Sequence, residues 1–350
     1  MERPGPRPRI ADVARAAGVS KTAVSFAFNS PDRLSAETVT RIRDVADRLG
    51  YRPNPVARML AQGQTMTLGV LTPQALAVIF SNPFFALFSE GVAQAAEDLG
   101  YELHFISPVH GSLELAIGRA MVDGVVAIGL SADHPEVGQI LAAGLPMVLV
   151  DSDDLPEHSS VVVDDEAGAR AAAEHLLGLG HRDILVLAVE GPQSATMQPG
   201  QPRGVSERRL RGYGAALERA GVPLQSDHVI AGRASIEGGA DAFQRAWATG
   251  IRPTAILAMS DAMAVGVTRA ARELGLRIPD ALSVVGFDDI DLAAHVDPPL
   301  TTVHQPIREK GAVAARLLLA RIAVGSAQRP ERVRLATDLI VRASTTRPNR

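Results

Sequence analysis

The chain has 350 residues, 46% of them apolar and none of them cysteine, with a formal net charge of −4. This length suggests two or three compact units, and the apolar content excludes a largely disordered protein. Without cysteine, disulfides and cysteine-ligated zinc are excluded. The sequence shows neither a signal-peptide pattern after Met1 nor a run near the ~18 apolar residues of a membrane span. We therefore expect a cytoplasmic protein with no membrane partner.

Charge is distributed unevenly along the chain. Residues 1–67 carry 11 Arg or Lys against 6 Asp or Glu, whereas the remainder carries 24 against 33. A small basic head on an acidic body is typical of a phosphate-binding module joined to a separate regulatory domain. Chance asymmetry produces the same pattern.

Two short helices are predicted near the N-terminus. Apolar residues recur at helical spacing over Ile10–Ala17, and Gly18 follows as a natural stop. Ser20 can cap a second helix that starts at Lys21, and Pro31 follows its end. Two helices joined by a tight glycine-containing turn form the geometry that presents the second helix to the major groove of DNA.

A third helix is expected between Ser35 and Gly50. Its predicted buried stripe consists of Val39, Ile42, Val45, Ala46 and Leu49. The periodicity of these three segments fits a plain three-helix bundle as well as a DNA-binding head.

Two segments resemble the lactose/galactose repressor (LacI/GalR) family. Residues Ile10–Asn29 resemble its DNA-binding head, and Leu49–Leu60 is similar to its hinge. The resemblance implies a helix-turn-helix domain at 8–52, a hinge at 53–65 and a ligand-binding and dimerisation core at 66–345. It implies a homodimer that binds a palindromic double-stranded operator as a transcriptional repressor.

The resemblance also assigns roles on the second helix. Lys21 and Thr22 would meet base edges in the major groove. The family usually has Arg where this chain has Phe26, so the operator should differ from the family norm at that base. For Phe26, a base contact and packing against the hinge or third helix remain equal alternatives. Phosphate positioning or packing is implied for Ser25, Asn29, Arg33 and Tyr51.

The hinge carries a separate implied mechanism. In the resembled proteins the segment at 54–61 becomes helical only on DNA and enters the minor groove. Leu60 holds the position of the apolar wedge that kinks the duplex, with core or dimer packing as its alternative. Asn54 and Arg58 would contact phosphates or groove edges, and Pro55 suits the first turn of a helix.

The rest of the chain alternates strands and helices, which predicts βαβ units and parallel sheets in two lobes. The expected strands are Thr67–Leu71, Glu102–Ile106, Gly124–Ile128, Met147–Val150, Ser160–Val163, Ile184–Ala188, Ala255–Ala258 and Leu282–Val285. The expected helices include Phe84–Leu99, Glu166–Leu179, Glu207–Ala220, Gly238–Thr249 and Asp261–Leu274.

The family resemblance extends over this body. It is carried by Ser81–Phe85, Val163–Ala169, Arg209–Tyr213, Ser260–Ala264, Val284–Asp289 and Leu300–Pro306, and Arg342–Thr345 matches the family's C-terminal strand. The implied fold is an α/β core like the periplasmic sugar-binding proteins. It has two Rossmann-like lobes with parallel sheets, crossed three times by the chain, and binds a small-molecule effector between them.

Polar residues past strand ends are candidate effector contacts, because ligands bind outside the carboxyl ends of parallel strands. Carboxylates and guanidinium groups suit sugar hydroxyls or purine edges. By matching positions, Asp288 and Arg209 are the strongest candidates. The others are Arg203, Asp261, Phe84, Phe85 and Asp151. For a strand-end aspartate such as Asp261, a helix N-cap or a turn residue is the alternative.

Ala234 stands where some relatives place an aromatic that stacks on the ligand, so we favour a carbohydrate or small polyol over a purine. No nucleotide-binding or nucleophile-elbow motif occurs, and His181–Asp183 lacks the motifs that accompany a kinase triplet. We expect no cofactor, no metal and no enzyme activity. A repressor that has lost ligand response, and a sugar-binding protein that shares the core fold, remain rival interpretations.

Overall fold

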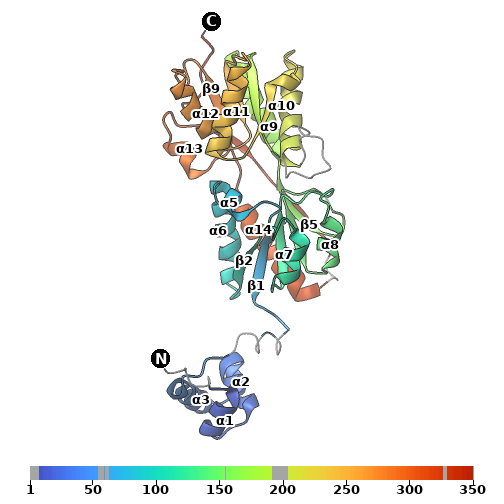
Figure 1. Cartoon of the computed structure of the whole chain (residues 1–350), viewed down its shortest axis with the longest axis vertical. Coiled ribbons are helices and arrows are strands. Elements are labelled where there is room, and N and C mark those ends of the chain that lie inside the picture. Colours follow the sequence, from blue (N-terminus) through green and yellow to red (C-terminus); the bar gives the residue numbers. More distant parts are fainter. Residues whose placement is uncertain are drawn as a thin grey trace. The chain divides into compact units, whose positions relative to one another are not determined.

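The computed structural model describes residues 8–53, 59, 63–153, 155–190, 204–325 and 329–349. The chain divides into two units, residues 1–65 and 66–350, shown in Figure 1. Four predicted site residues, Asn54, Arg58, Leu60 and Arg203, lie outside the described residues. Within the described ranges, no helix has the length and apolar character needed to cross a bilayer.

The first unit contains the three predicted helices, α1 (Ile10–Ala17), α2 (Lys21–Asn29) and α3 (Ala36–Leu49), with a short 3-10 turn η1 (Pro31–Arg33) before α3. Gly18 ends α1 in the left-handed region at φ 67°, which favours glycine. The Ser20 hydroxyl accepts the N–H of Ala23 and so caps α2. The predicted turn chemistry is confirmed.

The three helices enclose a small apolar core. Its buried members include Val13, Val24, Ile42 and Val45. Leu49 was expected on the buried stripe of α3, but it is 41% exposed. It is the last residue of that helix, where the left-handed Gly50 ends the turn that would have covered it.

The second unit has two lobes, and the first lobe is built on a parallel six-stranded sheet in the order β11-β5-β4-β3-β1-β2. Its strands are β1 (Thr67–Leu71), β2 (Glu102–Ile106), β3 (Gly124–Ile128), β4 (Met147–Val150), β5 (Ser159–Val163) and β11 (Arg332–Leu335). Helices α6 (Pro83–Glu97) and α14 (Ile307–Val324) share one apolar cluster with the sheet. A second cluster includes α7 (Leu113–Arg119) and α8 (Val137–Ala142). The short helix α5 (Leu76–Ile79) precedes α6.

The second lobe has a six-stranded sheet in the order β12-β10-β9-β8-β6-β7. Its strands are β6 (Ile184–Val189), β7 (Val229–Gly232), β8 (Ala255–Ala258), β9 (Ser283–Asp288), β10 (Thr301–His304) and β12 (Asp338–Ile340), of which β12 runs antiparallel to β10. Helices α9 (Asp165–Leu179) and α10 (Val205–Arg219) pack in one cluster, and α11 (Ile236–Ala248) and α12 (Asp261–Glu273) in another. The short elements η2 (Ser226–His228) and α13 (Asp291–His295) complete this lobe.

The chain crosses between the lobes three times, from β5 to α9, from β10 to α14 and from β11 to β12, as predicted. Four strands, β7, β10, β11 and β12, were absent from the predicted set. They are short, and β11 and β12 follow a helix near the C-terminus, where their apolar runs are brief.

The expected C-terminal strand at Arg342–Thr345 is wrong, because the strand in this region is β12 at Asp338–Ile340. The residues after it still attach to the sheet. The carbonyl of Ser344 accepts the N–H of Val284, and its hydroxyl accepts the N–H of Thr301.

Helices α6 and α14 approach each other closely at two glycines. A Cβ added at Gly91 would collide with the carbonyl of Arg308, and one added at Gly311 would collide with the carbonyl of Phe88. The absence of side chains here lets α14 lie against α6 at backbone distance. This contact fixes the start of α14, which carries part of the site described next.

Candidate functional site

The predicted DNA-contacting residues of α2 share one face of that helix. Lys21, Thr22, Ser25, Phe26 and Asn29 are spaced at one and two helical turns, and none of them belongs to the buried core. The Asn29 amide donates to the Ser25 hydroxyl at 3.3 Å. The helix contains no acidic residue, so nothing on it repels a phosphate backbone.

Tyr51 lies differently from these residues. It is only 8% exposed, belongs to the apolar cluster of the head and has its ring centroid 5.9 Å from that of Phe28. Burial raises the pKa of its hydroxyl. Of the two roles considered for Tyr51, this geometry supports packing, and its contact with DNA stays a prediction.

At the junction of the two lobes, a buried lysine joins two polar residues from separate segments. Lys310, in the first turn of α14, is fully buried, and its Nζ lies 3.0 and 2.7 Å from the two carboxylate oxygens of Asp151. The same Nζ donates to the Gln305 side-chain oxygen at 2.5 Å. All three donors of the ammonium group therefore have protein acceptors.

The contacts continue from Gln305 into the second lobe. Its amide nitrogen donates to Asp288 at 2.6 Å, and Asp288 lies 3.9 Å from the Arg209 guanidinium. Arg209 in turn donates to Asp165 at 2.9 Å and lies 3.5 Å above the Phe287 ring. We call this chain of six residues the polar relay: Asp151, Lys310, Gln305, Asp288, Arg209 and Asp165.

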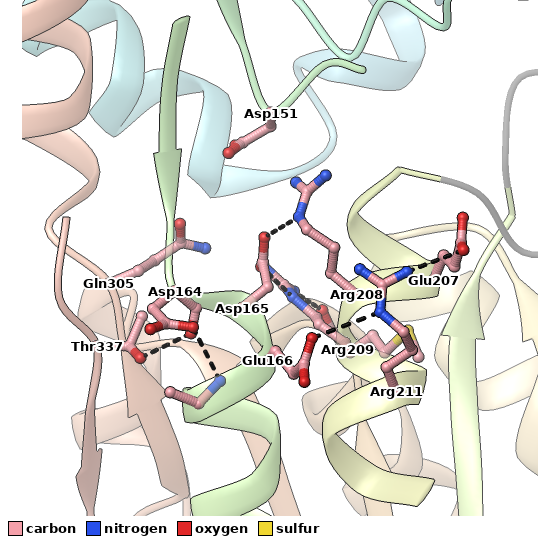
Figure 2. A network of polar contacts seen from close by, with 12 residues as sticks. Asp151, Asp164, Asp165, Glu166, Glu207, Arg208, Arg209, Arg211, Gln305 and Thr337 are labelled. Atoms are coloured by element: carbon pink, nitrogen blue, oxygen red, sulfur yellow. Dashed lines mark hydrogen bonds and ion pairs between the residues drawn. The ribbon is translucent and has the colours of Figure 1, made fainter. Parts of the chain in front are cut away.

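A second arginine reaches the end of the relay. Arg208 donates to Asp165 at 2.9 Å, and Figure 2 shows Arg208 and Arg209 approaching this carboxylate from α10. The neighbouring Arg211 forms ion pairs with Glu166 and Glu207 at 3.4 and 2.9 Å, and all three side chains of this outer group are about half exposed. The exposed group is therefore distinct from the buried relay.

Burial and neighbouring charges shift the pKa values in opposite directions along the relay. Burial disfavours the charged form of Asp165, but Arg209 and Arg208 outweigh it and lower the pKa of this carboxyl. For Asp288, burial dominates and raises the pKa to about 6, although Arg209 opposes the shift. Burial therefore outweighs the arginine at Asp288, whereas the two arginines outweigh burial at Asp165.

Two relay aspartates occupy unusual backbone conformations at strand ends. Asp151, just after β4, has φ 49°, and Asp288, the last residue of β9, has φ 127°. Residues other than glycine rarely adopt positive φ values, and such strain concentrates at ligand-binding sites. Hydrogen bonds from Lys310 and Gln305 hold the two carboxylates at these strand ends.

Asp261 does not join the relay. It is fully buried, and its carboxylate accepts the N–H of Ile290 at 2.9 Å and the Thr302 hydroxyl at 2.5 Å. Burial and the charge of Asp288 raise the pKa of Asp261 to about 8. The alternative of a helix N-cap or turn residue is wrong, because Asp261 is the first residue of α12 and Ser260 caps this helix by accepting the N–H of Met263. These contacts give Asp261 a structural role, and its contact with an effector stays a prediction.

The two predicted aromatic residues lie at the start of α6. Phe84 is 8% exposed, and its ring meets that of Phe85 edge-on at 5.4 Å between centroids. The Lys310 ammonium lies 5.3 Å from the Phe84 centroid. Of the predicted effector contacts, Asp151, Arg209 and Asp288 thus belong to the relay, and Phe84 lies beside it.

A cavity of about 400 Å³ adjoins the far end of the relay. Its lining includes Asp165, Arg208 and Arg211 from the second lobe and Arg332 and Arg334 from β11. None of the described effector candidates lines it. Among the described residues, no cluster of His, Asp and Glu side chains has the arrangement of a metal site.

Four residues of this junction were not predicted as site residues: Asp165, Arg208, Gln305 and Lys310. The sequence does indicate that Lys310 is buried, because it falls on the apolar stripe of α14, one turn after Ile307 and one turn before Ala314. Gln305 and Asp165 follow β10 and β5 at two of the lobe crossings. Their pairing required the three-dimensional arrangement of the crossings.

Each of the two units matches a known protein family. Residues 9–54 match the family described as bacterial regulatory proteins, lacI family, and residues 173–345 match a periplasmic binding protein-like domain. The transcriptional regulator DegA of Bacillus subtilis is 32% identical over 347 residues, which cover 96% of this chain and 98% of DegA.

Two solved structures match over the full length. The lac repressor dimer bound to operator and the anti-inducer ONPF has a TM-score of 0.80 at 28% identity, covering 97% of this chain and all of that chain. The complex of the transcriptional regulator CelR with cellobiose has a TM-score of 0.71 at 30% identity, with the same coverage.

Proposed function

The chain belongs to the lacI family of bacterial regulatory proteins, and from this membership we propose how its two units divide the work of a ligand-responsive repressor. The protein is a DNA-binding transcription regulator and not an enzyme. Its helix-turn-helix head binds operator DNA, and its two-lobed core binds a small-molecule effector.

In the head, Lys21 and Thr22 contact base edges, and Ser25 and Asn29 position the helix against phosphates. Their shared face on α2 and the absence of acidic residues on that helix support this role. Two copies of the chain pair so that two heads occupy a palindromic operator. Through this binding the protein associates with the nucleoid.

The effector is a carbohydrate or small polyol that binds at the relay. Asp288 and Asp151 offer acceptors and Arg209 offers donors, which is the mixture that sugar hydroxyls require. Phe84 adds an apolar surface beside them. The CelR structure carries cellobiose, in accord with this choice.

The observation that carries the proposal is the relay itself, because charged groups from both lobes meet at strand ends in a buried setting. The test measures binding of the full chain to a duplex selected from a random library, with and without each member of a sugar panel. Thermal unfolding with the same panel reports ligand binding without DNA. A sugar at 100 times its Kd should add about 2.7 kcal/mol to the free energy of unfolding.

Asp288→Asn should remove the response to that sugar while operator binding persists. A matched control is Glu207→Gln, which changes a half-exposed carboxylate of the outer group. If the protein binds its operator but no sugar changes either measurement, the ligand-blind repressor is the better description. If no duplex is preferred, the proposed function is refuted.

A further inference from the structure

The DNA-facing side of α2 contains one aromatic residue among polar ones. Phe26 shares the face of Lys21, Thr22, Ser25 and Asn29 and is partly exposed. The apolar cluster of the head recruits the other phenylalanine of this helix, Phe28, but does not include Phe26. Core packing within the head therefore does not account for Phe26.

The Phe26 ring forms a cation–π contact with an arginine of the next turn. The guanidinium carbon of Arg33, in η1, lies 5.1 Å from the ring centroid. A cation over an aromatic face is an attractive contact, so Arg33 favours this position of the ring. Arg33 itself is exposed, as is Lys21 at the start of the helix, so the surface that carries Phe26 also offers cations to phosphates.

From this arrangement we propose that Phe26 reads the C5-methyl group of a thymine in the major groove, with Arg33 holding the ring in place. This inference rests on the proposed function, because it requires α2 to enter the groove. Among the groups that base pairs present there, only the thymine methyl is apolar, and phenylalanine is one of the side chains that contact it. An adenine, guanine or cytosine edge would leave its polar groups facing the ring unpaired.

The spacing on the helix limits where the thymine lies. Phe26 is four residues after Thr22, a rise of about 6 Å, which is a little less than two base steps of about 3.4 Å each. We therefore expect one thymine in each half-site, one or two base pairs from the position read by Thr22. A symmetric dimer places the same thymine in both half-sites.

The test uses the full chain and the duplex that it selects from a random library. Each thymine is replaced in turn by deoxyuridine, which lacks only the C5-methyl group. A replacement in one half-site should weaken binding about fourfold, the factor that corresponds to ~0.8 kcal/mol for one buried methyl group. The same replacement in both half-sites should weaken it about sixteenfold. Replacements elsewhere should have smaller effects.

Variants assign the effect to this side chain. Phe26→Ala should bind the thymine and deoxyuridine duplexes equally, and Phe26→Leu should keep part of the difference because it retains an apolar tip. Phe28→Leu is the matched control, since it changes a phenylalanine of the same helix that packs against the apolar cluster and should preserve the wild-type profile. Circular dichroism checks that the variants keep the fold of the head.

The inference is overturned if the wild type shows no deoxyuridine-sensitive position, or if that position remains equally sensitive in Phe26→Ala and Phe26→Leu. In either case, selective binding to the duplex would still support the proposed function as a DNA-binding regulator. Failure to select any duplex would instead refute the proposed function, and the thymine contact with it.

Discussion

Lys310→Met tests how strongly the buried ammonium group and Asp151 depend on each other. The Lys310 side chain is fully buried, the Asp151 side chain is 10% exposed, and their shortest N–O distance is 2.7 Å. Methionine fills a similar apolar volume, so the cavity contribution should be small. The main cost is a buried carboxylate without its cation, and breaking such a pair costs about 3–5 kcal/mol.

The companion variants Asp151→Asn and Lys310→Met/Asp151→Asn complete a double-mutant cycle. Removing both charges leaves no unpaired ion, so the double variant should lose less than the sum of the single variants, with a coupling of about 2 kcal/mol. Urea unfolding followed by far-ultraviolet circular dichroism gives the free energies. Arg211→Met is the control, because its ion pairs are about half exposed and each is worth about 1 kcal/mol or less.

Two results would refute this reasoning. If Lys310→Met cost no more than Arg211→Met, the ammonium group would not be compensating a buried charge. If the two single effects were additive, Lys310 and Asp151 would stabilise the core independently, in conflict with the bidentate contact between them.

Three further predictions concern other parts of the chain. Asp261 has a folded pKa of about 8 against about 4 in an unfolded chain, so the stability it contributes is full below pH 4 and lost as pH rises toward 8. Asp261→Asn carries no such proton, and its melting temperature should gain on wild type as buffers are stepped from pH 5 to pH 8. A constant difference would contradict the shift. Gly91→Ala should destabilise the core by about 1–3 kcal/mol in urea unfolding through overpacking, whereas Gly118→Ala, with open space around it, should stabilise its helix by up to ~1 kcal/mol. Lys21→Ala should relax base preference if Lys21 contacts guanine, or lower operator affinity and change the salt slope by about one if it contacts phosphate. Binding titrations at several salt concentrations distinguish the two contacts. If neither base preference nor salt slope changed, Lys21 would be excluded from the interface.

Local signals predicted the head almost completely. Gly18, Ser20 and Gly50 terminate or cap helices through contacts within a few residues. The ends of these helices can therefore be predicted from neighbouring residues alone. Leu49 was misplaced because periodicity assigns it to the stripe without knowing that the third helix stops there. Strands β10, β11 and β12 were missed because their pairing depends on partners far along the chain.

The effector candidates illustrate a different limit. Strand-end position selected Asp151 and Asp288, and the structure brings both into the relay, since the edge of a parallel sheet is fixed by topology. The same rule also selected Asp261, which turns inward to Ile290 and Thr302. Position along the chain does not reveal which way a carboxylate points. Nor does it reveal that Lys310, on a later helix, forms an ion pair with Asp151.

The relay differs along its length in how it can respond to movement of the lobes. Arg209 and Asp165 both belong to helices of the second lobe, so their contact is kept when that lobe moves as a body. Gln305 lies on a crossing segment and bonds Lys310 at the start of α14 and Asp288 at the end of β9, so rotation of one lobe must change at least one of these two distances. An effector shifts an equilibrium only through contacts that differ between the two states. A sugar hydroxyl that replaces the Gln305–Asp288 bond would act on such a contact, whereas one bound only to Arg209 and Asp165 would add affinity without a switch. We therefore expect the coupling between effector and operator, about 1–3 kcal/mol in allosteric proteins, to depend most directly on Gln305.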